Sequence, residues 1–368
     1  MRMVIGILII FSSLLFAVTC KSNRNVGLGN SSDIVITDAA GRQVAISGTS
    51  KFIITISQTE IFRILDAESR VAGVNRWVNQ LNADENPVLS KLPVIGGFTP
   101  GEVNYEMIFK IANETPEEDV VLTYNQIWAD DIEKKIGNSD KIKVIKLNLF
   151  GSDEPQKEIA ILGKALGKEA ESERYLKWFD SLFVLVKSRI MGIPEKDRIK
   201  VYWDASGQGH YDTAGKNSSA EKIISNAGGM MLSGHLPQST TVSPEWIMQE
   251  NPGIILSHAS NVRHKTDIRF GYSAVNIDTT KLFETWSAML SFPGIESTDA
   301  ARNKKVYYIS DDLMFGPSQP VGVVLLGKLF YPDIFADINI RELLKYYYEN
   351  FMKLEYKGFY LYPATIIL

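Results

Sequence analysis

The sequence has little of several residue types that would mark a function. It contains a single cysteine, Cys20, so neither a disulfide framework nor a zinc ribbon is possible. It has no excess of basic residues, because the net charge is −4 and both signs are interspersed, which argues against a nucleic-acid partner. Its four histidines all lie in the second half of the chain and show no HxH or HExxH spacing, which gives no support to a bare metal site. They are His210, His235, His258 and His264.

Catalytic motifs are also absent. The stretch GKNSSAEK lacks the GxxxxGK[ST] frame of a phosphate loop, and no GxSxG elbow accompanies the Ser, His and Asp of GHYDTAGKNS. Asp311 and Asp312 are interpreted as a turn rather than as metal ligands. We therefore expect that the protein is not an enzyme. A metal-dependent enzyme that uses the C-terminal histidines is kept as an alternative.

The amino terminus has the pattern of an export signal. Arg2 is followed by an apolar run that is short for a membrane span, and residues 1–20 fit a signal peptide. Cys20 ends the run and precedes a polar linker over residues 21–32, which predicts lipidation at Cys20. The preceding Thr19 departs from the small residue usual there, so cleavage nearby or an uncleaved anchor stays open. All three readings export the rest of the chain, and a mature part without cysteine suits an exported protein that needs no disulfides.

What is present is an alternation of short apolar runs and amphipathic segments. DIVITDAAGRQVAI predicts a hairpin, and KFIITIS and RVAGVNR predict strands on either side of a helical QTEIFRILDA. This pattern fills residues 33–150 and indicates an α/β lobe with a mostly parallel sheet. Residues 151–193 show only helical spacing, with a break near Gly167 and a long second helix.

The strand and helix pattern restarts in residues 194–368. KVYWDAS, GIILSHAS and KVYYIS read as strands, SSAEKIISNAGG as a capped helix, and residues 341–352 as a closing helix. The tail from Lys357 fits either a last strand or an arm packed on this lobe. The predicted fold is therefore α/β, with two lobes joined by a long helix and a cleft between them, where ligands commonly bind.

Two phrases, one in each lobe, resemble each other. In GEVNYEMIFKIANETPEEDVVLTYNQ and SPEWIMQENPGIILSHAS, a glutamate opens a helix that leads into an apolar strand with a polar or aromatic end. With DAAGRQVAI, RVAGVNR, YDTAGKNSSAEKIISNAGG and ARNKKVYYIS in this order, the chain resembles the substrate-binding proteins of ABC importers for cobalamin, ferric siderophores and haem. The resemblance covers residues 33–352 and implies two α/β lobes joined by one rigid helix.

The resemblance also implies a role for the two glutamates. In that family one glutamate of each lobe pairs with arginines of the membrane permease, and Glu106 and Glu245 occupy the matching positions. Carboxylates there would steer and orient docking more than add affinity. The alternative is that each only complements the dipole of its helix.

The ligand site is expected in loops that follow strands of both lobes. From the first lobe we predict Gln58, Trp77, Tyr124 and Asn125, and from the second Trp203, Tyr211, His258 and Arg263. Aromatic rings offer flat contact to a macrocycle or catecholate, and an arginine pairs with an anionic group. The alternatives are that the tryptophans and His258 are structural and that Arg263 is a solvated charge.

These expectations combine into one function. The chain is predicted to be an exported, lipid-anchored, monomeric binding protein without a cofactor of its own, whose ligand is an iron or cobalt chelate. Its expected partners are the permease and ATPase of an ABC importer, with no nucleic acid. A bare metal ion or a small organic molecule as the cargo, and a surface receptor without a transporter, stay open.

Overall fold

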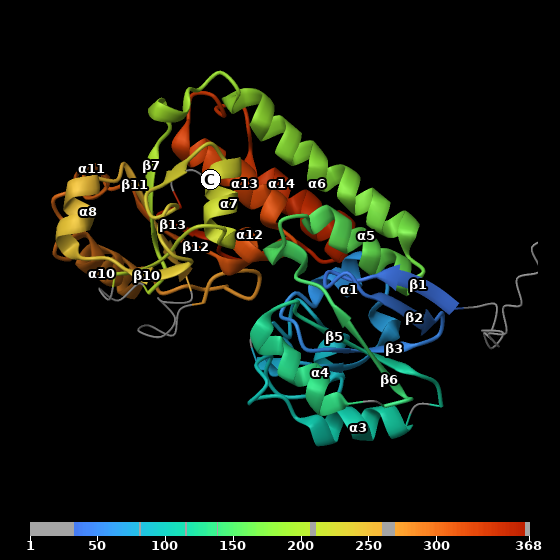
Figure 1. Cartoon of the computed structure of the whole chain (residues 1–368). Helices are drawn as coiled ribbons and strands as arrows, with labels where there is room; N and C mark the ends of the chain where they lie inside the picture. Colours follow the sequence, from blue (N-terminus) through green and yellow to red (C-terminus); the bar gives the residue numbers. More distant parts are fainter. Residues whose placement is uncertain are drawn as a thin grey trace, which may run out of the picture.

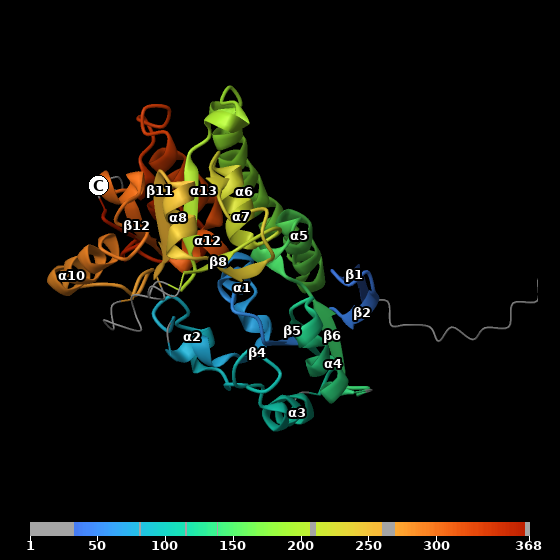
Figure 2. The same ribbon diagram turned by 60° about the vertical axis from the view of Figure 1, so that its left-hand side comes forward.

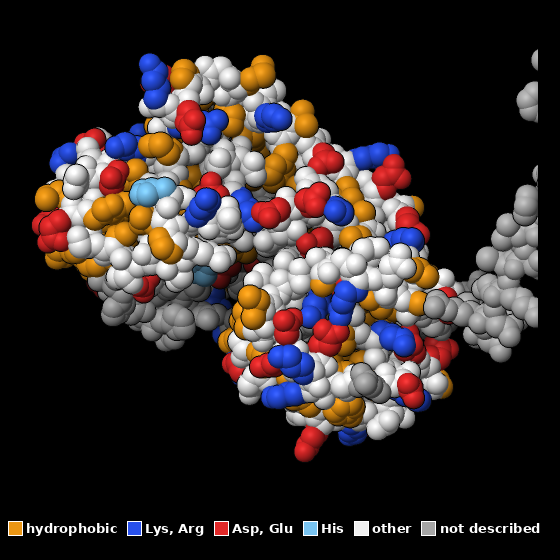
Figure 3. Space-filling model, viewed as in Figure 1, with side chains coloured by type: hydrophobic (Ala, Val, Ile, Leu, Met, Phe, Trp, Pro, Cys, Tyr) orange, Lys and Arg blue, Asp and Glu red, His pale blue; other side chains and the backbone are white. Residues whose placement is uncertain are grey.

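The computed structural model describes residues 33–80, 82–114, 116–137, 139–206, 211–259 and 269–364, which form two α/β lobes and a helical connector (Figure 1). The predicted α/β class is confirmed. The signal peptide, the linker and Cys20 lie outside the described residues. Within the described part, no helix is both long and apolar enough to cross a membrane. Lysine, arginine and acidic side chains are scattered over both lobes on the face shown in Figure 3.

The first lobe is built on a four-stranded parallel sheet in the order β4-β3-β5-β6. Its strands are apolar on both faces because helices cover both sides. Phe52 and Ile54 of β3 point into the main core, whereas Ile53 points into a second cluster beneath α3. An antiparallel hairpin, β1 with β2, precedes the sheet as predicted. The elements are β1 Asp33–Thr37, β2 Gln43–Ser47, β3 Lys51–Ile54, α1 Glu60–Ile64, β4 Val71–Val74, α2 Arg76–Gln80, α3 Tyr105–Glu114, β5 Asp119–Thr123, α4 Asp130–Ile136 and β6 Ile142–Lys146.

The connector consists of two helices, α5 (Pro155–Leu166) and α6 (Glu169–Ile190). Gly167 ends α5 in the left-handed conformation, a conformation that costs glycine little. The 22 residues of α6 span about 33 Å at the rise of an α-helix. Its buried face, which includes Tyr175 and Phe179, packs beside α13 (Figures 1 and 2). This long packed helix ties the two lobes together.

The second lobe has a five-stranded sheet in the order β13-β12-β11-β7-β9. Four strands are parallel, and β13 pairs antiparallel with β12, so the tail is a last strand. Helix α13 is buried at every position except Lys328, because the helices α6, α7, α12 and α14 pack around it. The elements are β7 Lys200–Asp204, β8 Asp212–Ala214, α7 Ser219–Asn226, β9 Met230–Met231, β10 Ser239–Thr241, α8 Pro244–Glu250, β11 Ile254–His258, α10 Thr279–Leu290, α11 Asp299–Arg302, β12 Val306–Ile309, α12 Asp311–Phe315, α13 Gln319–Phe330, α14 Ile340–Tyr347 and β13 Leu361–Tyr362.

Short helical turns complete the chain, and the last of them crosses between the lobes. The closing helix α14 continues into a π-helical turn, η6 (Tyr348–Met352), which packs on α1 of the first lobe. Arg63 of α1 donates a hydrogen bond to the carbonyl oxygen of Met352. The prediction assigned this segment to the second lobe alone, and the structure shows that it joins both. The remaining turns are η1 Glu68–Arg70, η2 Leu89–Lys91, η3 Ile127–Ala129, η4 Leu149–Gly151 and η5 Glu195–Asp197.

Candidate ligand cleft

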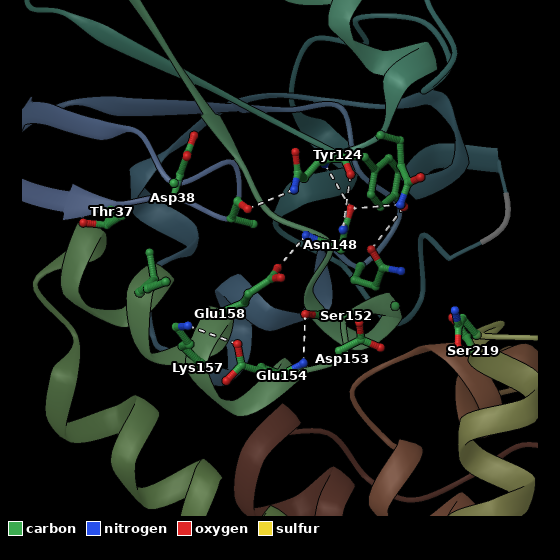
Figure 4. Close-up of a pocket in the computed structure, with 18 of the residues that line it drawn as sticks. Thr37, Asp38, Tyr124, Asn148, Ser152, Asp153, Glu154, Lys157, Glu158 and Ser219 are labelled. Atoms are coloured by element: carbon green, nitrogen blue, oxygen red, sulfur yellow. Dashed lines mark hydrogen bonds and ion pairs between the residues drawn. The ribbon is translucent and has the colours of Figure 1, made fainter.

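Two cavities lie between the lobes. The larger, of about 1010 Å³, is lined by first-lobe and connector residues such as Tyr124 and Glu158 and by Ser219 and Lys222 of α7 (Figure 4). The smaller, of about 300 Å³, lies between Trp77 and α12. Gln58 and Phe98 line both cavities. The volumes fall within the range of small-molecule sites.

One polar contact joins the lobes at Gln58, which lines both cavities. The side-chain Nε2 of Gln58, at the carboxyl end of the β3 segment, donates to the carbonyl oxygen of Phe315 across the lobes (3.3 Å). Gln58 also accepts a hydrogen bond from the Tyr124 hydroxyl (3.1 Å). Gln58 was predicted to bind ligand, and in the structure it lies in the cleft at a point where the two lobes touch.

Four aromatic side chains of the first lobe form a continuous row, which we call the aromatic strip: Trp77, Phe98, Tyr124 and Trp128. Ring centroids are 6.4 Å apart for Trp77–Phe98 and for Phe98–Tyr124, and 5.7 Å apart for Tyr124–Trp128. Trp128 is 41% exposed, although a tryptophan is usually mostly buried. The strip therefore offers the cavities a partly uncovered aromatic wall.

The polar atoms along this wall are held by neighbours. The Tyr124 hydroxyl lies 2.8 Å from Ser57 Oγ and accepts a hydrogen bond from the Ser57 backbone N–H (3.0 Å). Burial raises the pKa of Tyr124, so the phenol stays protonated and able to donate. The Asn125 side chain donates to the carbonyl oxygen of Ala39 (3.0 Å), which ties it to the cavity wall. The strip is thus preorganised rather than free to collapse.

Trp77 leaves one donor without a partner. Its indole N–H is buried and makes no hydrogen bond within the described part of the chain. Arg76 lies over the ring, with its guanidinium carbon 4.7 Å from the ring centroid. A buried donor normally has a partner. An acceptor on a bound molecule would supply one.

Comparison with known proteins identifies this architecture. The sequence matches the family model described as "Periplasmic binding protein" over residues 53–313. The chain belongs to the periplasmic binding protein family. No curated protein sequence matches it significantly.

Solved structures of periplasmic binding proteins share the fold. The TroA-like protein FepB of Veillonella parvula has a TM-score of 0.72 at 24% identity, covering 89% of this chain and 99% of that one. The molybdate-binding protein MolA of Haemophilus influenzae has a TM-score of 0.69 at 20% identity, covering 88% and 99%. The haem-binding protein RhuT of a Roseiflexus species has a TM-score of 0.57 at 19% identity, covering 78% and 99%. Members of this family bind and deliver substrates for ABC transporters, so this chain is a binding protein and not an enzyme.

In the second lobe of this periplasmic binding protein, two of the residues predicted to bind ligand, Trp203 and Tyr211, do not line either cavity. Trp203 is 2% exposed, lies in the main core and lines neither cavity. Trp203 lies within β7, a strand that is buried on both faces, and not in the loop beyond the end of the strand. Tyr211 also lines neither cavity, and its hydroxyl donates to the carbonyl oxygen of Pro293 (3.0 Å). Arg263 lies outside the described residues.

His258 has a structural environment. Its Nε2 lies 3.0 Å from Asp311 Oδ1, and its ring packs on Trp203 and Phe315. Asp311 and Asp312 open helix α12, so the predicted turn is wrong, and both line the smaller cavity. Among the residues that the structure describes, no three His, Cys, Asp or Glu side chains are grouped to hold a metal ion.

The two predicted docking glutamates occupy equivalent places. Glu106 lies in the first turn of α3 and Glu245 in the first turn of α8, and both side chains are exposed. Helices α3 and α8 lie at the outer ends of the two lobes (Figure 1). Asn104 Oδ1 caps α3 by accepting from the Met107 N–H (3.0 Å), and Ser243 Oγ caps α8 by accepting from the Trp246 N–H (3.2 Å). Because the carboxylate of Glu245 accepts from its own backbone N–H and from Ser243, its pKa lies below the ordinary value.

Sequence reasoning missed half of the aromatic strip. Phe98 follows two glycines in a loop, and Trp128 lies in the turn η3, four residues after Tyr124. The sequence offered one signal, the closeness of Trp128 to the end of β5 at Thr123. Residues that follow a strand end tend to lie at a cleft, but the sequence does not show which of their side chains point into it.

Proposed function

We propose that this periplasmic binding protein captures a metal chelate in the cleft and delivers it to an ABC permease. The chelates in question are a ferric siderophore, cobalamin or haem, and the protein itself carries no cofactor. The observation that supports the proposal is the aromatic strip, which lines both inter-lobe cavities with ring faces suited to a macrocycle or catecholate.

The ligand would contact the first lobe most extensively. Trp128 and Tyr124 offer ring faces in the larger cavity, and the unpaired indole N–H of Trp77 offers a hydrogen bond in the smaller one. The Asn125 amide and Gln58 fix the polar edge of the wall. Trp203 would act from the core by supporting His258 and Phe315 rather than by touching the ligand.

Delivery would use the exposed glutamates. Glu106 and Glu245 present one carboxylate on each lobe, an arrangement that would let arginines of the permease pair with both lobes. Export through residues 1–20 and a lipid at Cys20 would keep the protein at the outer face of the cell membrane, next to its permease and ATPase. The long, packed connector favours small lobe movements on binding, which scattering profiles with and without ligand would measure.

Intrinsic tryptophan fluorescence tests the proposal. Two of the six tryptophans, Trp77 and Trp128, line the cavities, so a bound chelate should quench them saturably. The titration uses haem, cobalamin, several ferric siderophores, molybdate and free Fe, Zn and Mn ions. Trp128→Phe should remove much of the quenching, whereas Trp178→Phe, on the connector helix, should not. Quenching by a bare ion alone or by molybdate alone would contradict the proposal that the cargo is a metal chelate.

A further inference from the structure

Three carboxyl groups from both lobes meet at the smaller cavity. Glu60, at the start of α1, is 6% exposed, and Glu85, in the loop after α2, is 5% exposed. Both belong to the first lobe. Asp312, in the first turn of α12, reaches the same cavity from the second lobe. We call these three groups the carboxyl cluster.

None of the three carboxyl groups forms an ion pair within the described residues. Glu60 accepts from its own backbone N–H and makes two long side-chain hydrogen bonds, from Asn82 Nδ2 (3.3 Å) and Asn86 Nδ2 (3.4 Å). Glu85 accepts one from the Tyr348 hydroxyl of η6 (3.0 Å). Asp312 accepts one from Ser310 Oγ (3.3 Å). Such sparse partners do not offset the removal of the Glu60 and Glu85 charges from water, and Asp312 beside them is half-buried.

The basic groups that the structure describes near the cluster have other partners, although the charge of Arg63 opposes part of the rise in the pKa of Glu85. Arg63, on α1, pairs with Glu68 (3.3 Å) and donates to the carbonyl oxygen of Met352. Arg269, which lines the same cavity, donates to the carbonyl oxygen of Gln80 (3.1 Å). Lys357 lies 3.5 Å from Asp84 and over the ring of Tyr272.

The remaining titratable neighbours are acids or neutral donors. Asp311 adds a further negative charge beside Asp312, and His258 pairs with Asp311 rather than with the cluster. Four tyrosines surround the cluster, and burial raises the pKa of each, so they stay uncharged. They are Tyr272, Tyr347, Tyr348 and Tyr360.

This environment favours protonated carboxyls. Burial, and next the charge of a neighbouring aspartate, raises the pKa of Glu60 and of Asp312 to about 7. Burial, Asp312 and Glu60 raise that of Glu85 well above its ordinary value. Asp312 thus acts on both first-lobe glutamates across the interface.

The amide that faces Glu60 is shared with the backbone. Asn86 is fully buried, and its Nδ2 lies 3.4 Å from Glu60 Oε1 and 3.2 Å from the carbonyl oxygen of Asn82. The long, shared bond to Glu60 therefore compensates little for a buried negative charge.

We propose that the carboxyl cluster is a proton-held clasp: the lobes stay in firm contact while Glu60, Glu85 and Asp312 share protons, and the contact weakens when the protons leave. The loss of protons would place like charges from both lobes around one cavity, two of them on the buried side chains of Glu60 and Glu85. This inference concerns the ligand-free protein and does not depend on the identity of the cargo.

The sign of the effect follows from linkage. Each group has a higher pKa in the folded, closed protein than in an unfolded or separated one, so the closed form binds more protons. The stabilising contribution is complete near pH 4.5 and below. It decreases as the pH rises through about 7. The lobes should therefore loosen in mildly alkaline solution.

Thermal unfolding of the ligand-free protein between pH 5 and pH 8 tests the clasp. We expect the wild-type midpoint to fall by about 5 °C or more over this range. The triple variant Glu60→Gln/Glu85→Gln/Asp312→Asn should flatten the profile and unfold at a higher temperature than wild type at pH 8. Asp312→Asn alone should remove more than a third of the slope, because Asp312 also raises the pKa of both glutamates.

Two control variants separate the clasp from other titrations. Glu102→Gln replaces a half-exposed first-lobe carboxylate that pairs with Arg76, and its profile should match wild type. His258→Gln removes the imidazole that pairs with Asp311 and should leave the slope in place. A flat wild-type profile, a triple variant that keeps the slope, or a slope lost in His258→Gln would each overturn the proposal. An Asp312→Asn variant with an unchanged slope would refute the cross-lobe part.

Discussion

The two lobes share a frame but differ in what they present to the cleft. Each has a parallel core sheet, and each carries an exposed glutamate in the first turn of an outer helix. The first lobe lines the cleft with the aromatic strip, whereas the second buries Trp203 and presents Phe315 and the polar start of α12. Features repeated in both lobes suit docking to a symmetric partner, and the feature found in one lobe suits ligand binding.

The largest effect should come from the repeated feature. Reversing both charges with Glu106→Arg/Glu245→Arg should reduce uptake by intact cells more than tenfold, because like charges would face the permease arginines. Ligand affinity of the purified protein should stay within about twofold of wild type. Each single reversal should give a smaller and similar loss if the lobes contribute equally.

A matched pair of variants serves as control for the docking prediction. Glu114→Arg and Glu284→Arg reverse exposed acids at other places on the same two lobes. Both should transport normally. Equal losses in these variants would point to net charge rather than to the two helix starts.

Substitutions of Trp203 and Trp128 should have opposite effects on stability and on ligand affinity. Trp203→Ala removes a fully packed core side chain and should lower the free energy of unfolding by about 3–5 kcal/mol. Trp128→Ala should lower it by less than about 1 kcal/mol, because the side chain is 41% exposed, yet it should weaken ligand binding at least about tenfold. Chemical unfolding and fluorescence titration measure the two quantities. If Trp203→Phe, which keeps an aromatic ring in the core, weakened ligand binding as much as Trp128→Ala, the assignment of ligand contact to the first lobe would be wrong.

The smallest effect should come from the contact that joins the lobes at Gln58. Gln58→Ala deletes the hydrogen bond to the Phe315 carbonyl and should cost about 0.5–1.5 kcal/mol of stability. The two cavities should merge, so small ligands should bind less tightly and bulky ones equally well or better. A variant that loses affinity for every ligand alike would show that Gln58 binds ligand directly.

The sequence allowed the frame to be predicted more fully than the cleft. Alternating strands and helices, the long connector and both helix-opening glutamates follow from local patterns, and the structure has each of them. Trp203 was misplaced because an apolar strand such as KVYWD does not show where its buried part ends. Glu60 has the pattern of an ordinary polar residue at a helix start, and only the structure, in which η6 packs on α1 and Asp312 lines the same cavity, reveals its burial.

The most direct test of the account is a crystal structure of the protein with the chelate that quenches its fluorescence. The account predicts the ligand between the lobes, with its ring or catecholate faces on Tyr124, Phe98 and Trp128 and an acceptor within hydrogen-bonding distance of the Trp77 indole nitrogen. A ligand bound elsewhere with the cleft empty, or held only by second-lobe residues while the aromatic strip stays free, would contradict it.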